Sequence, residues 1–157
     1  MSRIVVAVRH AHPEAPSGYA SDDLIPLCDE GRIAQEKVVK ALNQAGYIPT
    51  KILTSPLLRA KQTAEIIADY FGVNYEVFEA LGSYFDRELL MSRLQYLDDH
   101  EVVYLVGHAP TLAELVNDLA GEQVLHYGLS KSCAAVIQFD QRIIMGSGRF
   151  LEHFSPS

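Results

Sequence analysis

The stretch Arg3-Ile4-Val5-Val6-Ala7-Val8-Arg9-His10 near the N-terminus is an apolar run that ends in an arginine and a histidine. A second run of this kind, Val102-Val103-Tyr104-Leu105-Val106-Gly107-His108, lies in the second half of the chain. Uninterrupted apolar runs are typical of strands covered on both faces, as in parallel sheets. Ligands of open α/β sheets bind at the carboxyl ends of the strands. The two histidines therefore indicate one site at that edge, and the arginine indicates an anionic ligand.

Outward from these two runs, predicted strands alternate with predicted helices. Strands are expected at 3–9, 51–54, 73–78, the run before His108, 132–139 and 149–154, and helices at 29–45, 57–71, 87–97 and 111–119. The alternation predicts an α/β fold, a three-layer sandwich with a mostly parallel central sheet and helices on both faces. No repeat, low-complexity tract or linker divides the sequence, so residues 1–157 are expected to form a single domain.

Two of the helices carry more detailed predictions. Residues spaced near the helical repeat predict the apolar face of the helix at 29–45, namely Ile33, Val38, Ala41 and Leu42. Ser55-Pro56 predicts an N-cap serine and a first-turn proline for the helix that starts at Leu57. The polar segment 11–28 before the first helix is longer than a plain connection, which indicates function or mobility.

Composition limits which binding partners and which cellular compartment are expected. The 157 residues are 48% hydrophobic and 21% charged, which is ordinary for a globular protein. The net charge of −7 argues against nucleic acid or an anionic membrane as the main partner. The apolar runs are too short for a signal peptide or a membrane span. Cys28 and Cys133 lack metal-ligand spacing, so reduced thiols and a cytoplasmic location are expected.

Three motifs occur in order along the chain: Arg9-His10-Ala11, then Ser55-Pro56-Leu57-Leu58-Arg59-Ala60-Lys61-Gln62-Thr63-Ala64, then Gly107-His108. Together they resemble the histidine phosphatase superfamily, which has Arg-His-Gly after the first strand, Ser-Pro-x-x-Arg-Ala-x-x-Thr-Ala at a helix start, and a second histidine. The resemblance implies a phosphoglycerate mutase-like fold. Each motif alone is weak, but the set covers most of the chain.

The segment Asp23-Leu24-Ile25-Pro26-Leu27-Cys28-Asp29-Glu30-Gly31 is similar to the Asp-x-x-Arg-Pro-Leu-Thr-x-x-Gly stretch of the small SixA-type phosphohistidine phosphatases. His12-Pro13 departs from the mutase and sugar-bisphosphatase branch, which continues with Glu-Thr or Gln-Thr. Ile25 stands where the SixA-type stretch has arginine, so any substrate contact of that arginine is absent.

The resemblance implies a catalytic set of His10, Arg9, Arg59 and His108. His10 is expected to be a neutral nucleophile, with the proton on its other ring nitrogen and its pKa lowered by the arginines. Arg9, Arg59 and His108, the last if protonated against the bound phosphate, are expected to bind the phosphoryl oxygens. Neither a metal ion nor another cofactor is expected.

The residue that would protonate the leaving group is less well defined. The candidates after the third predicted strand are Glu79, Asp86 and Glu88, with Glu79 as the possible proton donor and a plain surface carboxylate as the alternative. The SixA-type pattern has its glutamate one position later, where this chain has Ala80. A phosphohistidine substrate needs less acid assistance, because an imidazole can leave already protonated.

Structural alternatives exist for the individual residues. Arg9 could cap the end of a strand, and His10 could be a hydrogen-bonded histidine of the core. Arg59 could be a solvated helix residue. Thr63, one turn after Arg59, is expected to have a packing role, with reinforcement of the pocket as the alternative. His12 is expected either at the pocket rim or exposed in a loop. The remaining histidines are expected to be structural or solvated: His100, His126 and His153.

The sequence thus predicts a metal-independent phosphatase that forms a phosphohistidine intermediate and acts on phosphohistidine in proteins. The first alternative is a phosphatase of small phosphomonoesters on the same scaffold. The second is a phosphate- or phosphoprotein-binding module without turnover. The presence of His10 argues against this alternative, because a pure binding module needs no nucleophile. The expected partners are accordingly a phosphorylated protein or a small phosphomonoester, and neither nucleic acid nor a membrane.

Overall fold

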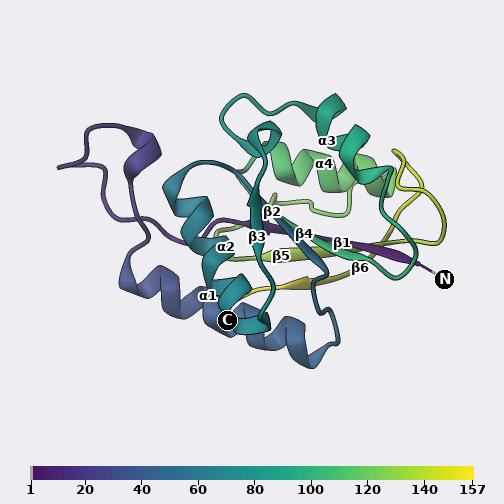
Figure 1. Ribbon diagram of the computed structural model, residues 1–157, viewed down its shortest axis with the longest axis horizontal. Helices are drawn as coiled ribbons and strands as arrows, with labels where there is room; N and C mark the ends of the chain where they lie inside the picture. The colour runs from purple at the N-terminus through teal and green to yellow at the C-terminus, as the bar shows by residue number, and fades with distance from the viewer. Residues whose placement is uncertain (1) are drawn as a thin grey trace.

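The computed structural model describes residues 2–157 and contains a single six-stranded sheet within that range (Figure 1). The strands are β1 (Arg3–Arg9), β2 (Lys51–Thr54), β3 (Tyr75–Val77), β4 (Val102–Gly107), β5 (Ala134–Phe139) and β6 (Arg149–Phe154). The α-helices are α1 (Asp29–Gln44), α2 (Leu58–Phe71), α3 (Arg87–Leu94) and α4 (Thr111–Ala120), and two short 3₁₀ segments are η1 (Asp22–Leu24) and η2 (Glu79–Leu81). The predicted elements are all present, with ends that differ by a few residues.

The two apolar runs of the sequence form the centre of the sheet. The strand order is β3-β2-β4-β1-β5-β6, and β1, β4, β2 and β3 are parallel where they are neighbours. Strands β5 and β6 pair in antiparallel fashion at the other edge. Arg9 lies opposite Gly107 in the register of β1 and β4. The two strands therefore end side by side, and the residues that follow them, His10 and His108, lie at the same edge of the sheet.

Helices cover both faces of the sheet, as predicted (Figure 1). Val6 and Val8 of β1 pack in the core layer under α1 and α2, whereas Val5 and Ala7 pack in the layer under α3 and α4. All four are at most 1% exposed. Burial on both faces explains why these strands read as continuous apolar runs rather than as alternating ones.

Two helix predictions were wrong in detail. The face of α1 that packs inward contains Gly31, Gln35, Val38, Val39 and Leu42, whereas Ile33 is 56% exposed. Hydrophobic spacing could not reveal this, because two of the buried positions of the helix, Gly31 and Gln35, do not have apolar side chains. Helix α2 begins at Leu58 with Leu57 at the N-cap, so Ser55 is not the cap and Pro56 does not lie in the first turn.

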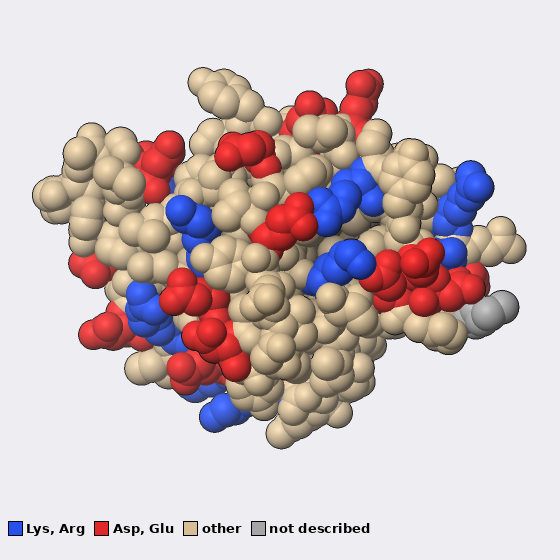
Figure 2. Space-filling view, viewed as in Figure 1, with Lys and Arg blue, Asp and Glu red and all other residues tan. Residues whose placement is uncertain are grey.

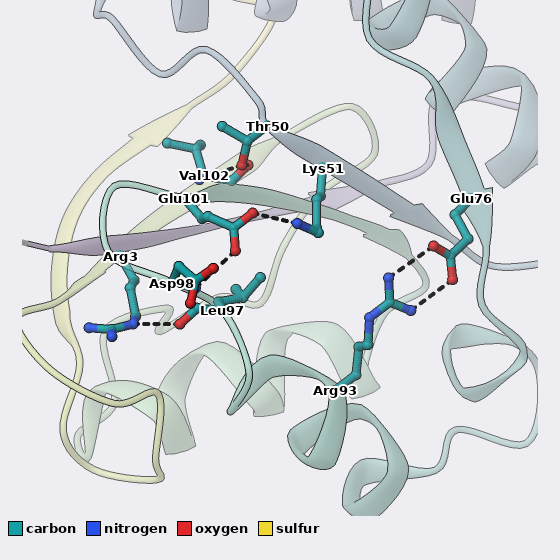
Figure 3. A network of polar contacts seen from close by, with 9 residues as sticks. All are labelled: Arg3, Thr50, Lys51, Glu76, Arg93, Leu97, Asp98, Glu101 and Val102. Carbon is teal, nitrogen blue, oxygen red and sulfur yellow. Dashed lines mark hydrogen bonds and ion pairs between the residues drawn. The ribbon is translucent and has the colours of Figure 1, made fainter.

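Polar contacts join the strand ends that are remote from the histidines, and one joins the edge strand β3 to α3 (Figure 3). Lys51 pairs with Glu101, and Arg3 donates from Nε to the Leu97 carbonyl oxygen at 2.7 Å. Arg93 of α3 makes a forked pair with Glu76 of β3, at 2.7 and 2.9 Å. These contacts fix α3 and the strand connections, and none of them includes the histidines at the carboxyl ends of the strands.

The surface shown in Figure 2 has acidic and basic side chains interspersed rather than a continuous basic patch. Among residues 2–157, no helix has both the length and the apolar character needed to cross a membrane.

Candidate active site

The carboxyl ends of β1 and β4 bring the two motif histidines together. His10 follows β1 and His108 follows β4, and their ring centroids are 5.1 Å apart with the planes inclined by 55°. The backbone N–H of His10 donates to the Gly107 carbonyl oxygen at 3.0 Å, which ties the two strand ends together. The structure thus brings the two motif histidines together at one edge of the sheet.

The imidazole of His10 is held in a defined tautomer. Its Nδ1 lies 2.8 Å from the Ala11 carbonyl oxygen, and a carbonyl only accepts, so Nδ1 carries the proton. The other nitrogen, Nε2, therefore has a free lone pair in the neutral ring. Burial lowers the pKa of His10 to about 4, helped by the charges of His108, Arg59 and Arg9 and opposed by the Ala11 hydrogen bond. The ring is neutral at physiological pH, as a nucleophile requires.

Helix α2 fixes the backbone that follows His10. The Thr63 hydroxyl accepts from the Ala11 N–H at 3.0 Å and donates to the Arg59 carbonyl at 2.8 Å. Thr63 is fully buried, as a packing residue would be, but it also has this hydrogen-bonding role. Gln62 accepts from the Leu27 N–H at 2.8 Å, so the same helix also holds the far end of the 11–28 segment.

The two arginines differ in their surroundings. Arg9 donates from Nη1 to the Leu129 carbonyl at 3.2 Å, while its buried Nε has no partner among the described residues. Burial lowers the pKa of Arg9 below its usual value. Arg59, in the first turn of α2, donates to the carbonyl and to the carboxylate of Asp22 at 2.9 and 3.0 Å. Its side chain is only 13% exposed, so it is not a solvated helix residue.

His108 lies against the residue that the sequence assigned to a helix cap. Its Nε2 is 2.7 Å from the Ser55 hydroxyl oxygen, which also accepts from the Leu57 N–H at 3.2 Å. Burial lowers the pKa of His108 to about 4, with the charge of Arg59 as the next cause. His108 is therefore neutral in the free site.

Among residues 2–157, none of the carboxylates considered as proton donors is hydrogen-bonded to the side chains of Arg9, His10, Arg59 or His108. Glu79 is exposed in η2 and lines a cavity of about 510 Å³ together with Asp23, Leu57 and Asp86. Asp86 caps α3 by accepting from the Leu89 N–H at 3.0 Å. Glu88 is exposed in the first turn of α3.

The other histidines are on the surface. His12 is exposed and lines a shallow hollow formed with residues 13–15 and 28–30, which favours the loop interpretation over the pocket-rim one. The remaining three are also exposed: His100, His126 and His153. Within residues 2–157, no group of three or more His, Cys, Asp or Glu side chains is arranged to hold a metal ion.

Sequence reasoning missed two contacts of the site. Asp22 binds Arg59 from the middle of the 11–28 segment, and a lone acidic residue in a polar loop gives no signal of such a partner. Ser55 bonds His108 from the end of β2, where its sequence context favours a helix cap.

Taken together, the residues define a class of protein. A parallel strand pair presents an unprotonated imidazole nitrogen beside guanidinium donors, one of them with an unpartnered buried N–H. Such a site suits transfer of a phosphoryl group to histidine, because forked cations match the phosphoryl oxygens.

Comparison with known proteins gives the family. Residues 5–103 match the model of the histidine phosphatase superfamily (branch 1). The chain is 30% identical over 154 residues to the phosphohistidine phosphatase SixA of Escherichia coli, covering 92% of this chain and 90% of that one. It is 37% identical over 125 residues to an uncharacterized protein of Picosynechococcus sp., covering 76% and 74%. This chain belongs to the histidine phosphatase superfamily, branch 1.

Solved structures place it more closely within the family. The protein histidine phosphatase SixA complexed with tungstate superposes with a TM-score of 0.84 at 28% identity, over 98% of this chain and 97% of that one. A SixA homologue from Agrobacterium tumefaciens gives 0.84 at 24% identity over 98% of each chain, which supports the fold alone. The chain is a phosphatase of the SixA type.

Proposed function

We propose that this protein removes the phosphoryl group from phosphohistidine in proteins, with His10 as the nucleophile and Arg9, Arg59 and His108 as phosphate ligands. The observation that carries the proposal is the Nδ1–H bond from His10 to the Ala11 carbonyl, since it leaves Nε2 unprotonated for attack.

The reaction has two displacement steps. Nε2 of His10 attacks phosphorus in line, and the substrate P–N bond breaks with its electron pair going to the leaving imidazole, whose other ring nitrogen already carries a proton. Water then attacks the phosphoryl group on His10, the Nε2–P bond breaks, its electron pair returns to the ring, and inorganic phosphate leaves. The Ala11 carbonyl stabilises the positive ring formed between the steps, because the ring keeps its Nδ1 proton.

Arg9 and Arg59 are suited to stabilise the charge on the transferring group. The buried Nε of Arg9 has no partner among residues 2–157, so a phosphoryl oxygen would satisfy an otherwise costly donor. Arg59 has further N–H groups beyond the two that Asp22 accepts. Preorganised donors of this kind are each worth about 3–4 kcal/mol in the transition state.

Two observations support the proposed substrate class: the name of a relative, and the exposed position of the possible proton donor. The name of the Escherichia coli relative specifies phosphohistidine. Glu79, the possible proton donor, is exposed and lines an open cavity of about 510 Å³. An imidazole leaving group tolerates this arrangement better than an alkoxide does.

A side-by-side assay on a phosphohistidine protein and a panel of small phosphomonoesters tests the proposal. We expect the phosphoprotein to have the higher kcat/KM, and Glu79→Gln to change its hydrolysis less than twofold. If Glu79→Gln instead cost about 10²-fold or more, and the small phosphomonoesters were turned over faster, the alternative substrate class would be correct. Binding of phosphoprotein without any turnover would favour the binding module.

A further inference from the structure

Ser55 is placed beside His108 by the sheet itself. Its backbone N–H donates to the Val106 carbonyl oxygen at 3.0 Å, which extends the β2–β4 pairing by one residue beyond Thr54. The side chain then lies at the carboxyl edge with no exposed surface. Its hydroxyl oxygen has two contacts, the Leu57 N–H at 3.2 Å and Nε2 of His108 at 2.7 Å.

Hydrogen counting distinguishes two arrangements of this contact. A serine hydroxyl has one hydrogen and accepts two hydrogen bonds. If Nε2 of His108 carried a proton and donated it, the hydroxyl would accept from both Nε2 and Leu57. Its own hydrogen would then be buried with no acceptor among the described residues, which is costly. If the hydroxyl donates to an unprotonated Nε2, every group in the chain from Leu57 to Ser55 to His108 is satisfied.

We propose that Ser55 is a positioning residue for the phosphoryl-transfer reaction: it donates its hydroxyl hydrogen to Nε2 of His108 and so fixes the His108 proton on Nδ1. This inference rests on the proposed function of His108 as a phosphate ligand. Nδ1 of His108 has no hydrogen-bond partner among residues 2–157, so its N–H is free to donate to a phosphoryl oxygen.

The arrangement gives His108 a donor without a charge. In the free site His108 is neutral, because burial and the charge of Arg59 lower its pKa to about 4. A neutral imidazole is an effective phosphate donor only if the correct nitrogen carries the proton. Ser55 makes that selection from a strand end, where the sheet restricts its movement.

Nitrogen-15 NMR of the ring nitrogens tests the tautomer without any turnover. At pH 7 we expect His108 of the wild-type protein to have Nδ1 protonated and Nε2 unprotonated. Ser55→Ala should abolish that preference, whereas Thr54→Val, which removes the neighbouring buried hydroxyl that bonds only the Ser55 carbonyl, should keep it. A protonated Nε2 in the wild-type protein would overturn the proposal. This readout is independent of whether phosphohistidine is the substrate.

Kinetics give a second test through amide replacements of His108. An asparagine amide reaches the position of Nδ1 and a glutamine amide that of Nε2, so His108→Asn should retain more kcat than His108→Gln. Ser55→Ala should lower kcat by no more than the about 10²–10³-fold that one donor is worth, and should add nothing to the loss in His108→Ala. The opposite order of the amide variants, or losses that multiply, would contradict the role. If Ser55→Ala does not fold, the amide pair and the wild-type spectrum still decide.

Discussion

Arg59 serves both the site and the loop that borders it. Its guanidinium donates to two oxygens of Asp22, and its charge acts on the pKa of His10 and of His108. We predict that Arg59→Ala lowers kcat/KM by about 10²–10³-fold, because a preorganised cationic donor is lost. Arg59→Lys should retain more activity than the alanine variant but not the wild-type level, since lysine lacks the forked geometry.

Steady-state kinetics on the three proteins check this prediction. Arg149→Ala is a suitable control, because Arg149 lies on the edge strand β6 and bonds only Gln138. Equal activity of the lysine variant and the wild type would show that charge alone matters at this position.

The pKa of His10 predicts the acid limb of the pH profile. The reactive form is the neutral ring, and burial lowers the pKa from 6.5 to about 4. At pH 5 about 90% of His10 should still be neutral, against about 3% for a histidine with an ordinary pKa. The free enzyme should therefore keep most of its kcat/KM down to pH 5 and lose it as the pH falls through about 4.

The same shifts affect the stability of the fold. Folding disfavours protonation of both His10 and His108, so the stabilisation from their neutral forms is complete above pH 6.5 and is lost as the pH falls towards about 4. Rates corrected for substrate ionisation, with the folded state followed by circular dichroism, separate the two effects. An acid limb near pH 6.5 in a fully folded protein would contradict the neutral-site description.

At the scale of elements, the contact of α1 with the chain after β1 depends on a glycine. A Cβ at Gly31 would lie 2.3 Å from the His12 carbonyl oxygen, so the helix approaches the backbone closer than any side chain allows. Gly31→Ala should destabilise the protein by about 1–3 kcal/mol through overpacking, despite alanine being the better helix former. Thermal unfolding measures this effect, and an unchanged or raised melting temperature would show that the helix can shift without cost.

The motif at the start of α2 is explained by the contacts of its residues. Arg59, Gln62 and Thr63 bond Asp22, Leu27 and Ala11, and thereby hold the segment that follows His10. Ala60 and Ala64 are fully buried, where small side chains let the helix lie close to the sheet. The sequence pattern predicted this helix and the arginine, because apolar spacing and a motif with fixed intervals are local features.

Other features were not accessible from local pattern. Asp22 and Ser55 act through partners 37 and 53 residues away, and no periodicity encodes such pairs. The exposure of Ile33 likewise depends on what packs against α1 and not on the helix itself. The strand ends of the fold and the two histidines were predictable, because continuous apolar runs and sheet topology together determine where they lie.

For the whole molecule, the central claim is that a neutral His10 at the edge of the sheet is phosphorylated during turnover. Rapid quenching of the enzyme with a ³²P-labelled phosphohistidine protein tests it most directly. We predict label on the wild-type enzyme in a base-stable, acid-labile bond at His10, and neither label nor turnover in a folded His10→Ala variant. Turnover in His10→Ala close to the wild-type rate, or label in an acid-stable bond, would contradict the account.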